Sequence, residues 1–395
     1  MTSVQSDRPA SSFGRVVDLF AGPGGLDVAA RWLGLSAVGI EWDKNACTTR
    51  RAAGLETVQG DVREYGPADF PDAAMLVGGP PCQTYTVAGA GAGRRALEQV
   101  QNFISRMASG QDVTADLSHL DDERTGLVLQ PLRWILEAHQ RGHPYKTVVL
   151  EQVPAVLPVW EAMAEALHGL GYKTTSGILR AEEFGVPQTR RRAILIAHKD
   201  YMPRLPQPTH RRFRKREASS DDQLSLLSWE SMLRPCETIR GTLHRPGPFV
   251  IVSNYGSGGD PKARGLRSWE EPAATVTGKV SRNRVRSHDG TDLGSLELFE
   301  AGQLQTFPED YPWSGGDRAQ QIGNAIPPRL GAHVLAAALG RNLDLAALDE
   351  VVRSSWTDTG NRPPLLTDTL DTESLPPARP SAPNSVDPQL MPQQR

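Results

Sequence analysis

The sequence has few cysteines, no long apolar run and little net charge. Its 395 residues include three cysteines, Cys47, Cys82 and Cys236, which are too few and too scattered for a disulfide framework or a cysteine-rich zinc site. No apolar run reaches the length of about 18 residues that a membrane span needs, and the first residues lack the apolar core of a secretory signal. These absences predict a soluble protein of the reducing cytoplasm without a metal site.

The net charge of -3 hides an uneven distribution. Residues 201–295 contain 16 Lys and Arg against 10 Asp and Glu, so the rest of the chain is acidic. A basic segment within an acidic protein fits a surface directed at phosphates. An ordinary solvated face has a similar composition, so charge alone does not decide between these two interpretations.

Short apolar segments alternate with helical patterns between residues 13 and 199. Strands are expected at residues 16–20, 37–40, 75–77 and 147–150, with a helix over 26–35. Short buried strands separated by helices indicate an α/β fold with a parallel sheet. Residues 174–179 and 193–197 are two further strands, joined by a turn that contains Gly and Pro, and they predict an antiparallel hairpin at the sheet edge.

The remaining regions differ in composition. Residues 200–295 are rich in Pro, Gly, Arg and Ser and predict a small separate domain of irregular loops. Residues 296–345 return to helical patterns. Residues 1–12 and 346–395 lack periodicity, so we expect the first segment to be a disordered tail and the second to be largely disordered.

A glycine-rich turn follows the first expected strand. Residues 18–25 read DLFAGPGG, and glycines there let the backbone approach a ligand. Later strands end in Glu41-Trp42 and in Asp61, where acids can bind ribose hydroxyls and an adenine amine. The glycine turn alone is often structural, but turn and acids together favour an adenosyl ligand, since no triphosphate loop is present.

A second turn carries a cysteine. Residues 78–83 read GGPPCQ after the strand near residue 77. Two prolines stiffen the backbone before Cys82, and the carboxyl end of a strand is where open-sheet active sites lie. Cys82 is therefore a candidate nucleophile, against the alternative of an inert cysteine in a Gly-Pro turn. For Cys47 and Cys236 the inert interpretation is favoured.

Six segments in order resemble the motifs of the DNA (cytosine-5) methyltransferases, over nearly all of residues 15–340. They are DLFAGPGG (18–25), GPPCQ (79–83), EQV (151–153), QTRRR (188–192), LQTFP (304–308) and QIGNAIPP (321–328). The resemblance implies a Rossmann-like class I fold that uses S-adenosylmethionine, with a mostly parallel sheet and a small target-recognition domain. It also implies the domain order of catalytic 13–199, recognition 200–295 and catalytic 296–345.

The family's chemistry assigns roles to four residues. The resemblance makes Cys82 the nucleophile that adds to carbon 6 of cytosine and Glu151 the acid that stabilises the ring at nitrogen 3. Arg190 and Arg192 match its paired arginines, which are expected to hold the base oxygen and nearby phosphates, while Arg191 is expected to face away. The implied cofactor-binding residues are Asp18, Phe20, Gly22, Gly24, Gly25, Glu41, Trp42, Asp61, Val62, Pro80 and Asn324.

Carbon 5 is inaccessible within a stacked duplex, so the enzyme must flip the base out. We expect residues 84–124 to be the mobile loop that closes over it and residues 210–216 to contact phosphates. One departure concerns Gln152, where the family usually has Asn. Its extra methylene is expected to disturb the placement of Pro81 and Cys82.

Double-stranded DNA is the expected partner of a monomeric enzyme in the cytoplasm, associated with the nucleoid. A restriction endonuclease encoded separately is a possible companion. Two other functions stay open at this point. One is a transfer-RNA cytosine-5 methyltransferase on the same scaffold, although those relatives lack a sizeable basic recognition domain. The other is an inactive DNA-binding regulator, which the intact cysteine, acid and glycine turn disfavour.

Overall fold

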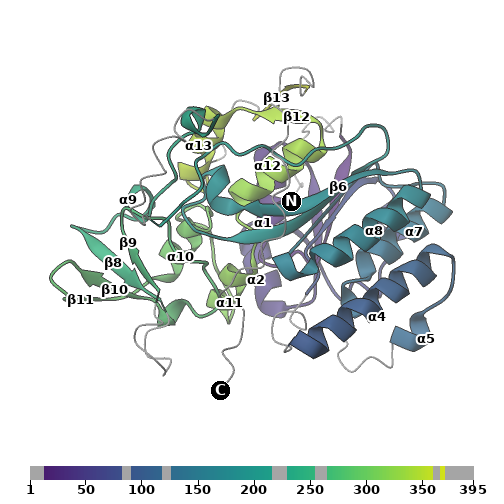
Figure 1. Cartoon of the computed structure of the whole chain (residues 1–395), viewed down its shortest axis with the longest axis horizontal. Coiled ribbons are helices and arrows are strands. Elements are labelled where there is room, and N and C mark those ends of the chain that lie inside the picture. The colour runs from purple at the N-terminus through teal and green to yellow at the C-terminus, as the bar shows by residue number, and fades with distance from the viewer. Residues whose placement is uncertain are drawn as a thin grey trace, which may run out of the picture.

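A computed structural model describes residues 13–81, 90–117, 126–215, 229–253, 265–358 and 365–369. Its centre is a seven-stranded sheet of order β3-β2-β1-β4-β5-β7-β6 (Figure 1). The first five strands run parallel, whereas β7 is antiparallel to both β5 and β6. The strands are β1 (Arg15–Leu19), β2 (Ala37–Glu41), β3 (Glu56–Gln59), β4 (Ala73–Gly78), β5 (Thr147–Gln152), β6 (Lys173–Arg180) and β7 (Arg191–His198).

Alternation along the strands sends apolar side chains to both faces of this sheet. Val16 and Val149 pack on one face with α1 (Gly25–Trp32) and α12 (Pro328–Ala338). Val17 and Val148 pack on the other with α4 (Ala90–Ala108), α7 (Gln130–Gln140) and α8 (Leu157–Gly169). Helices on both faces of a mostly parallel sheet with an antiparallel edge hairpin confirm the predicted fold class. Helix α2 (Lys44–Ala52) connects β2 to β3.

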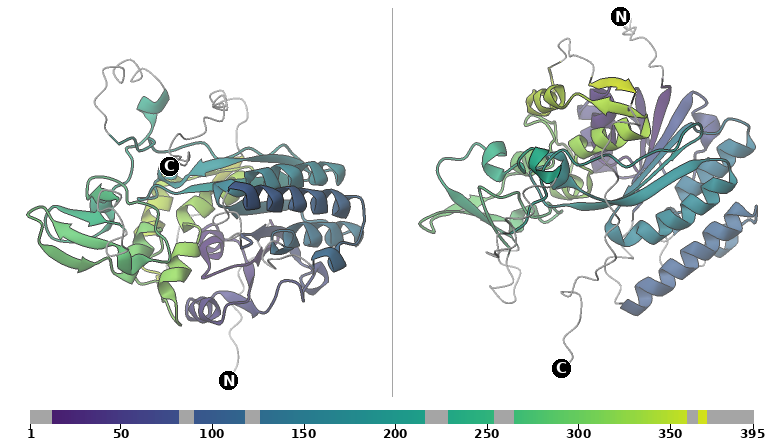
Figure 2. Two further views of the ribbon diagram at one scale, coloured as in Figure 1. Left: turned by 60° about the horizontal axis from the view of Figure 1, so that its bottom comes forward. Right: turned by 45° about the horizontal axis from the view of Figure 1, so that its top comes forward.

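A second sheet lies beside the first, in the green lobe of Figures 1 and 2. Its order is β11-β10-β8-β9, all antiparallel. The expectation of irregular loops missed these strands because each has only three or four residues, too few to show a period. They are β8 (Phe249–Val252), β9 (Leu266–Ser268), β10 (Arg284–Ser287) and β11 (Asp292–Ser295), accompanied by α9 (Ile239–Thr242), α10 (Leu298–Leu304) and α11 (Arg318–Asn324).

The C-terminal segment differs from the predicted tail. Residues 345–353 form helix α13, which the Asp344 carboxylate caps by accepting from the amides of Ala346 and Ala347. Strand β13 (Leu366–Thr369) pairs with β12 (Arg341–Leu343). Leu348 and Val351 are buried in the main core. The helix was missed because its apolar stripe is only two turns long.

The segment expected to form a mobile loop is in part a helix. Residues 90–108 form α4, and Val100, Phe103 and Ile104 are buried in the core cluster that also contains α8. A shorter helix, α5, spans Thr114–Leu117. Residues 84–89 and 118–124 of the expected loop lie outside the described residues. Among the described helices, none is both long and apolar enough to cross a membrane.

Candidate active site

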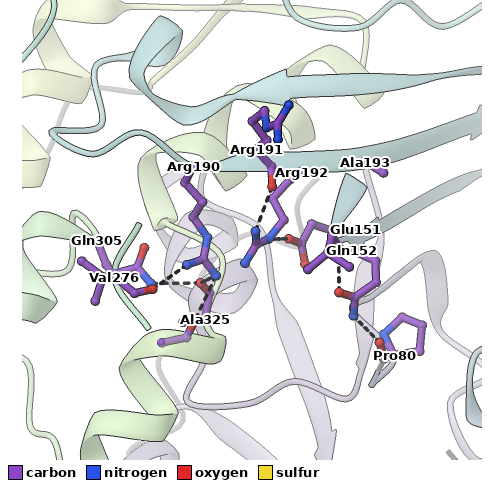
Figure 3. Close-up of polar contacts among 12 residues, drawn as sticks. Pro80, Glu151, Gln152, Arg190, Arg191, Arg192, Ala193, Val276, Gln305 and Ala325 are labelled. Carbon is purple, nitrogen blue, oxygen red and sulfur yellow. Dashed lines mark hydrogen bonds and ion pairs between the residues drawn. The ribbon is translucent and has the colours of Figure 1, made fainter. Parts of the chain in front are cut away.

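The expected site residues gather at one edge of the seven-stranded sheet. The parallel strands β1, β2, β4 and β5 end there, and the antiparallel β7 begins there. The edge therefore carries the glycine turn after β1, the Pro80 turn after β4, Glu151 of β5 and Arg192 of β7 (Figure 3). Cys82 lies outside the described residues and directly follows Pro81, which is described.

The glycine turn has a backbone that side chains would obstruct. Gly22 and Gly24 adopt φ of 55° and 106°, and Phe20 adopts φ of 62° although it is not glycine. A Cβ on Gly24 would lie 2.3 Å from the Leu55 side chain, and one on Gly25 would lie 2.4 Å from the carbonyl oxygen of Ile326. Close packing against Leu55 and Ile326 therefore requires glycine at positions 24 and 25, whereas a Cβ on Gly22 would meet no atom within 4 Å, so the backbone at Gly22 is open to a ligand.

Glu41 braces this turn from the end of β2. Its carboxylate accepts from the backbone N–H of Gly22 and from that of Asp43, both at 2.7 Å. Burial raises the pKa of Glu41 even though both hydrogen bonds oppose the shift. Each carboxylate oxygen keeps a lone pair for a further donor. The neighbouring Trp42 ring is 69% exposed, so its face is open to stacking.

Asp18, the second-last residue of β1, lies in a buried charged group that the sequence did not reveal. Arg50 donates to both carboxylate oxygens of Asp27, at 2.6 and 2.8 Å, and both side chains are buried. Burial, followed by the charge of Asp27, raises the pKa of Asp18 well above its ordinary value. Within the described part of the chain, Asp18 Oδ1 is buried without a hydrogen-bond partner. This orphaned oxygen beside the glycine turn is a position where a polar ligand group would be satisfied.

Asp61 follows β3 and is held by a neighbouring arginine. It accepts from the backbone N–H of Arg63 at 2.9 Å and from the Arg63 guanidinium, with the Nη2–Oδ2 distance at 2.5 Å. Burial alone would raise the pKa of Asp61, but the hydrogen bonds and charge of Arg63 outweigh it, so the pKa is lowered and the carboxylate stays ionised. Val62 is buried, and its carbonyl accepts from Arg133 at 2.9 Å and from Trp134 at 3.2 Å.

Glu151 and Arg192 form an ion pair at the centre of the edge. Arg192 Nε lies 2.5 Å from Glu151 Oε1, and the two side chains are only 12% and 9% exposed. The backbone of the cysteine turn lies close to this carboxylate, since a Cβ on Gly79 would be 3.3 Å from Glu151 Oε2. A largely desolvated carboxyl oriented by an arginine is suited to hydrogen-bond a heterocyclic ring.

Gln152 connects this pair to the cysteine turn. Its amide nitrogen donates to the carbonyl oxygen of Pro80, and its amide oxygen accepts from the N–H of Val153 at 2.7 Å (Figure 3). The longer side chain thus reaches the turn two residues before Cys82. The expected disturbance concerns Pro81 and Cys82, and because Cys82 lies outside the described residues it stays a prediction.

Arg190 occupies a different environment from the one expected for a base-contacting residue. Its side chain is buried, and its guanidinium donates to the carbonyls of Val276, Gly323 and Ala325 at 2.9–3.0 Å. Burial lowers its pKa well below the ordinary value. These donors join segments far apart in sequence, so the expected contact with the base oxygen is corrected to a contact with the protein backbone. Arg192 alone of the two faces Glu151.

Two buried amides strengthen the same junction. Gln188 accepts from the N–H of Val276 at 3.0 Å and donates to the carbonyl of Leu304 at 2.8 Å. Gln305 donates to the carbonyl of Ile322 at 2.6 Å. The motifs around both residues were quoted from the sequence, but the partners of these amides come from distant segments and could not be read from it.

Asn324 ends α11 at the surface, where its side chain accepts from Gln320 at 2.7 Å. Ile326, two residues later, packs against Gly25 of the glycine turn. The last motif therefore returns the chain to the first, as expected. No group of three or more His, Cys, Asp or Glu suited to a metal ion occurs in the ranges that the structure describes.

The predicted phosphate-contacting stretch 210–216 is exposed only in part. His210 is buried, and burial followed by the charge of Arg329 lowers its pKa to about 4, so it is a neutral core residue. Phe213 lies under the Arg267 guanidinium, 4.9 Å from its carbon. Arg267 Nη2 also lies 3.5 Å from Thr189 Oγ1. Arg216 lies outside the described residues.

The comparison with protein families decides the identity. The family described as C-5 cytosine-specific DNA methylase matches residues 14–340. The chain belongs to this family. The resemblance inferred from six motifs and the prediction of a DNA (cytosine-5) methyltransferase are thereby confirmed.

Curated relatives of this methylase are similar over most of its length. It is 25% identical over 350 residues to the Type II methyltransferase M1.HphI of Haemophilus parahaemolyticus, covering 82% of this chain and 87% of that protein. It is 29% identical over 333 residues to the Type II methyltransferase M.NlaX of Neisseria lactamica, covering 79% and 92%. Among solved structures, the S. pombe Dnmt2 methyltransferase has a TM-score of 0.54 at 16% identity, covering 82% of this methylase and 98% of that chain. The last likeness supports the fold alone.

Proposed function

We propose that this methylase transfers a methyl group from S-adenosylmethionine to carbon 5 of a cytosine flipped out of duplex DNA, with Cys82 as the covalent nucleophile. One observation carries the proposal. The Glu151–Arg192 pair lies at the edge where Gln152 holds Pro80, two residues before Cys82. An acid and a nucleophile on adjacent strand ends are what addition to a pyrimidine ring requires.

The glycine-turn region fits S-adenosylmethionine. The open backbone at Gly22 suits the approach of its methionine part, and the orphaned Asp18 oxygen suits a polar or cationic group. Glu41 would accept from the ribose hydroxyls and Trp42 would stack on adenine. The other proposed contacts are Phe20, Gly22, Asp61, Val62, Pro80 and Asn324. When bound, the cofactor supplies an electrophilic methyl group.

The chain's own residues would activate the base. The Cys82 thiolate adds to carbon 6, and the electron pair of the double bond moves into the ring. Glu151, as the carboxylic acid, donates a hydrogen bond or proton to nitrogen 3 and thereby stabilises that charge. Arg192 fixes the direction of Glu151 and stabilises the carboxylate that remains once the proton has moved to nitrogen 3. After methylation, the carbon 5 proton is lost to a base, the thiolate leaves carbon 6, and a proton on nitrogen 3 returns to Glu151, which restores the ring and the acid.

Arg190 would act as a positioning residue. Its three carbonyl partners lie in the segments around Val276 and Gly323–Ala325. The first lies next to the four-stranded sheet, and the second leads to the glycine turn. By holding both against the start of β7, Arg190 would fix where bound DNA sits relative to Glu151. Residues 200–295 remain the proposed recognition domain.

The relatives named above are Type II methyltransferases, which supports a role in a restriction–modification system. A cognate endonuclease encoded separately and a monomeric state belong to the same proposal. Genomic DNA as the substrate would place the enzyme at the nucleoid in the cytoplasm.

Bisulfite sequencing of DNA from cells that express the chain tests the proposal. We expect 5-methylcytosine at one short target sequence, and none with Cys82→Ser. Duplexes with 5-fluorodeoxycytidine at that target should form a covalent adduct with the wild type when methyl donor is present. Unmethylated DNA together with methylated transfer RNA would reject the DNA substrate, and methylation without any adduct would reject the covalent step.

A further inference from the structure

The guanidinium groups of three arginines beside the proposed active site make no hydrogen bond or ion pair within the described part of the chain. Arg180 ends β6 and Arg191 begins β7, and the two are direct register partners. Such cross-strand partners lie about 5 Å apart at Cβ and point to the same face of a sheet. Arg191 is exposed and Arg180 half-buried. The exposed Arg212 is close enough for its charge to act on Arg180.

This cluster is electrostatically unfavourable in the free protein. Burial, then the charges of Arg212 and Arg191, lowers the pKa of Arg180. The acids nearest to it, Glu182 and Glu183, are buried in the turn Ala181–Phe184 and offset the effect only in part. Like charges whose repulsion is only partly offset destabilise a fold, and a bound anion relieves that cost.

The cluster shares a sheet face with the turn that leads to Cys82. Gln152 of β5 is the register partner of Ala193 of β7, and Arg191 lies two residues from Ala193 on the same face. The Gln152 amide holds Pro80 on that face. Arg192 points to the opposite face, toward Glu151, and Figure 3 shows Arg191 directed away from this pair.

We propose that Arg180, Arg191 and Arg212 bind a backbone phosphate of the target DNA strand next to the flipped cytosine. The inference rests on the proposed function, because a base held by Glu151 must leave its flanking phosphates just outside this edge. Guanidinium groups suit a phosphate because they donate in a fork. The sequence of the site would not matter, since a phosphate contact carries no base information.

The first test measures the salt dependence of DNA binding. Arg180→Ala and Arg191→Ala should each reduce the slope of log K against log salt by about 1, in anisotropy titrations of a duplex that carries the bisulfite-defined target. The matched control is Arg141→Ala, because Arg141 is exposed at the end of α7, near the opposite edge of the sheet, and pairs with Glu137 at 3.2 Å. Equal slopes for all three variants and the wild type would overturn the proposal.

A second test removes charge from the DNA instead. Single methylphosphonate linkages are placed at each position around the target cytosine. At one or two linkages the wild type should lose as much affinity as Arg191→Ala loses on normal DNA, and Arg191→Ala should lose nothing more there. Additive losses at every position would show that the arginines contact no particular phosphate.

Kinetics separate this proposal from the function on which it rests. Arg180→Ala and Arg191→Ala should raise KM for DNA and leave kcat within about twofold of wild type, because they bind DNA but do not touch the reacting atoms. If the wild type methylates DNA but Arg180→Ala and Arg191→Ala have the same KM and kcat as Arg141→Ala, the phosphate site is refuted and the proposed function stands. A wild type that neither methylates nor binds duplex DNA defeats both proposals.

Discussion

The two sheets of the molecule use their side chains in opposite ways. The seven-stranded sheet is buried on both faces, and its polar functional groups emerge only where strands end. The four-stranded sheet packs Phe249, Ile251 and Val285 into a small core and bears arginines along its strands. The first arrangement fixes a few groups rigidly. The second lets exposed side chains change without disturbing the core, as the proposed recognition of different targets would require.

The largest expected effect falls on the seven-stranded sheet. Glu151→Gln should lower kcat by roughly 10²–10⁴, the usual contribution of a positioned acid. The measurement is the methylation rate at saturating DNA and methyl donor. Glu161→Gln, an exposed acid on α8, serves as the control. Retention of more than a tenth of the activity would contradict the role given to Glu151.

Arg190 connects the two regions, so its loss should appear as instability. Arg190→Met leaves three buried carbonyls without their donor, and we expect the free energy of unfolding to fall by roughly 2–5 kcal/mol. Urea denaturation measures this. Arg192→Met should cost less stability and more activity, since its partner is the single carboxylate of Glu151. Equal losses of stability in both variants would remove the distinction between the two arginines.

Acid should weaken the packing between α12 and the segment that leads toward the four-stranded sheet. Burial, then the charge of Arg329, lowers the pKa of His333 to about 3 and that of His210 to about 4. Both are neutral when folded and gain a proton when unfolded below about pH 6.5. Stability should therefore be complete above that pH and fall toward pH 4, by up to about 1.4 kcal/mol per pH unit for each histidine.

Denaturation curves at pH 7, 6 and 5 test this dependence. His333→Gln should flatten it, whereas His139→Gln, at an exposed position on α7, should not. A pH dependence unchanged by His333→Gln would show that this histidine is not responsible.

The smallest effect is expected on the four-stranded region. Arg282 is exposed in the turn between β9 and β10. Arg282→Ala should raise KM for DNA by roughly two- to fivefold and leave kcat unchanged, because it removes one peripheral cation. Steady-state rates over a range of duplex concentrations measure both constants. A tenfold fall in kcat would place this region within the chemistry and break the comparison.

The sequence predicted features of the seven-stranded sheet and missed features of the four-stranded sheet and of the junction between the two. Asp18, Glu41 and Glu151 are the last or second-last residues of their strands, so short local patterns suffice to place them at the strand ends. The burial of Arg190 depends on carbonyls that lie 86–135 positions away, which no local pattern encodes. The strands β8 to β11 are shorter than the window in which a period can be recognised, so the second sheet was taken for loops.

The contact between Gly25 and Ile326 has a consequence for biosynthesis. The ribosome delivers the glycine turn near the start of translation, but the residue that covers it comes some 300 positions later. Helix α12, which packs beside α1, follows directly after that residue. A nascent polypeptide therefore lacks the residue that packs against its glycine turn until most of the message has been read, and prematurely terminated products are left without it.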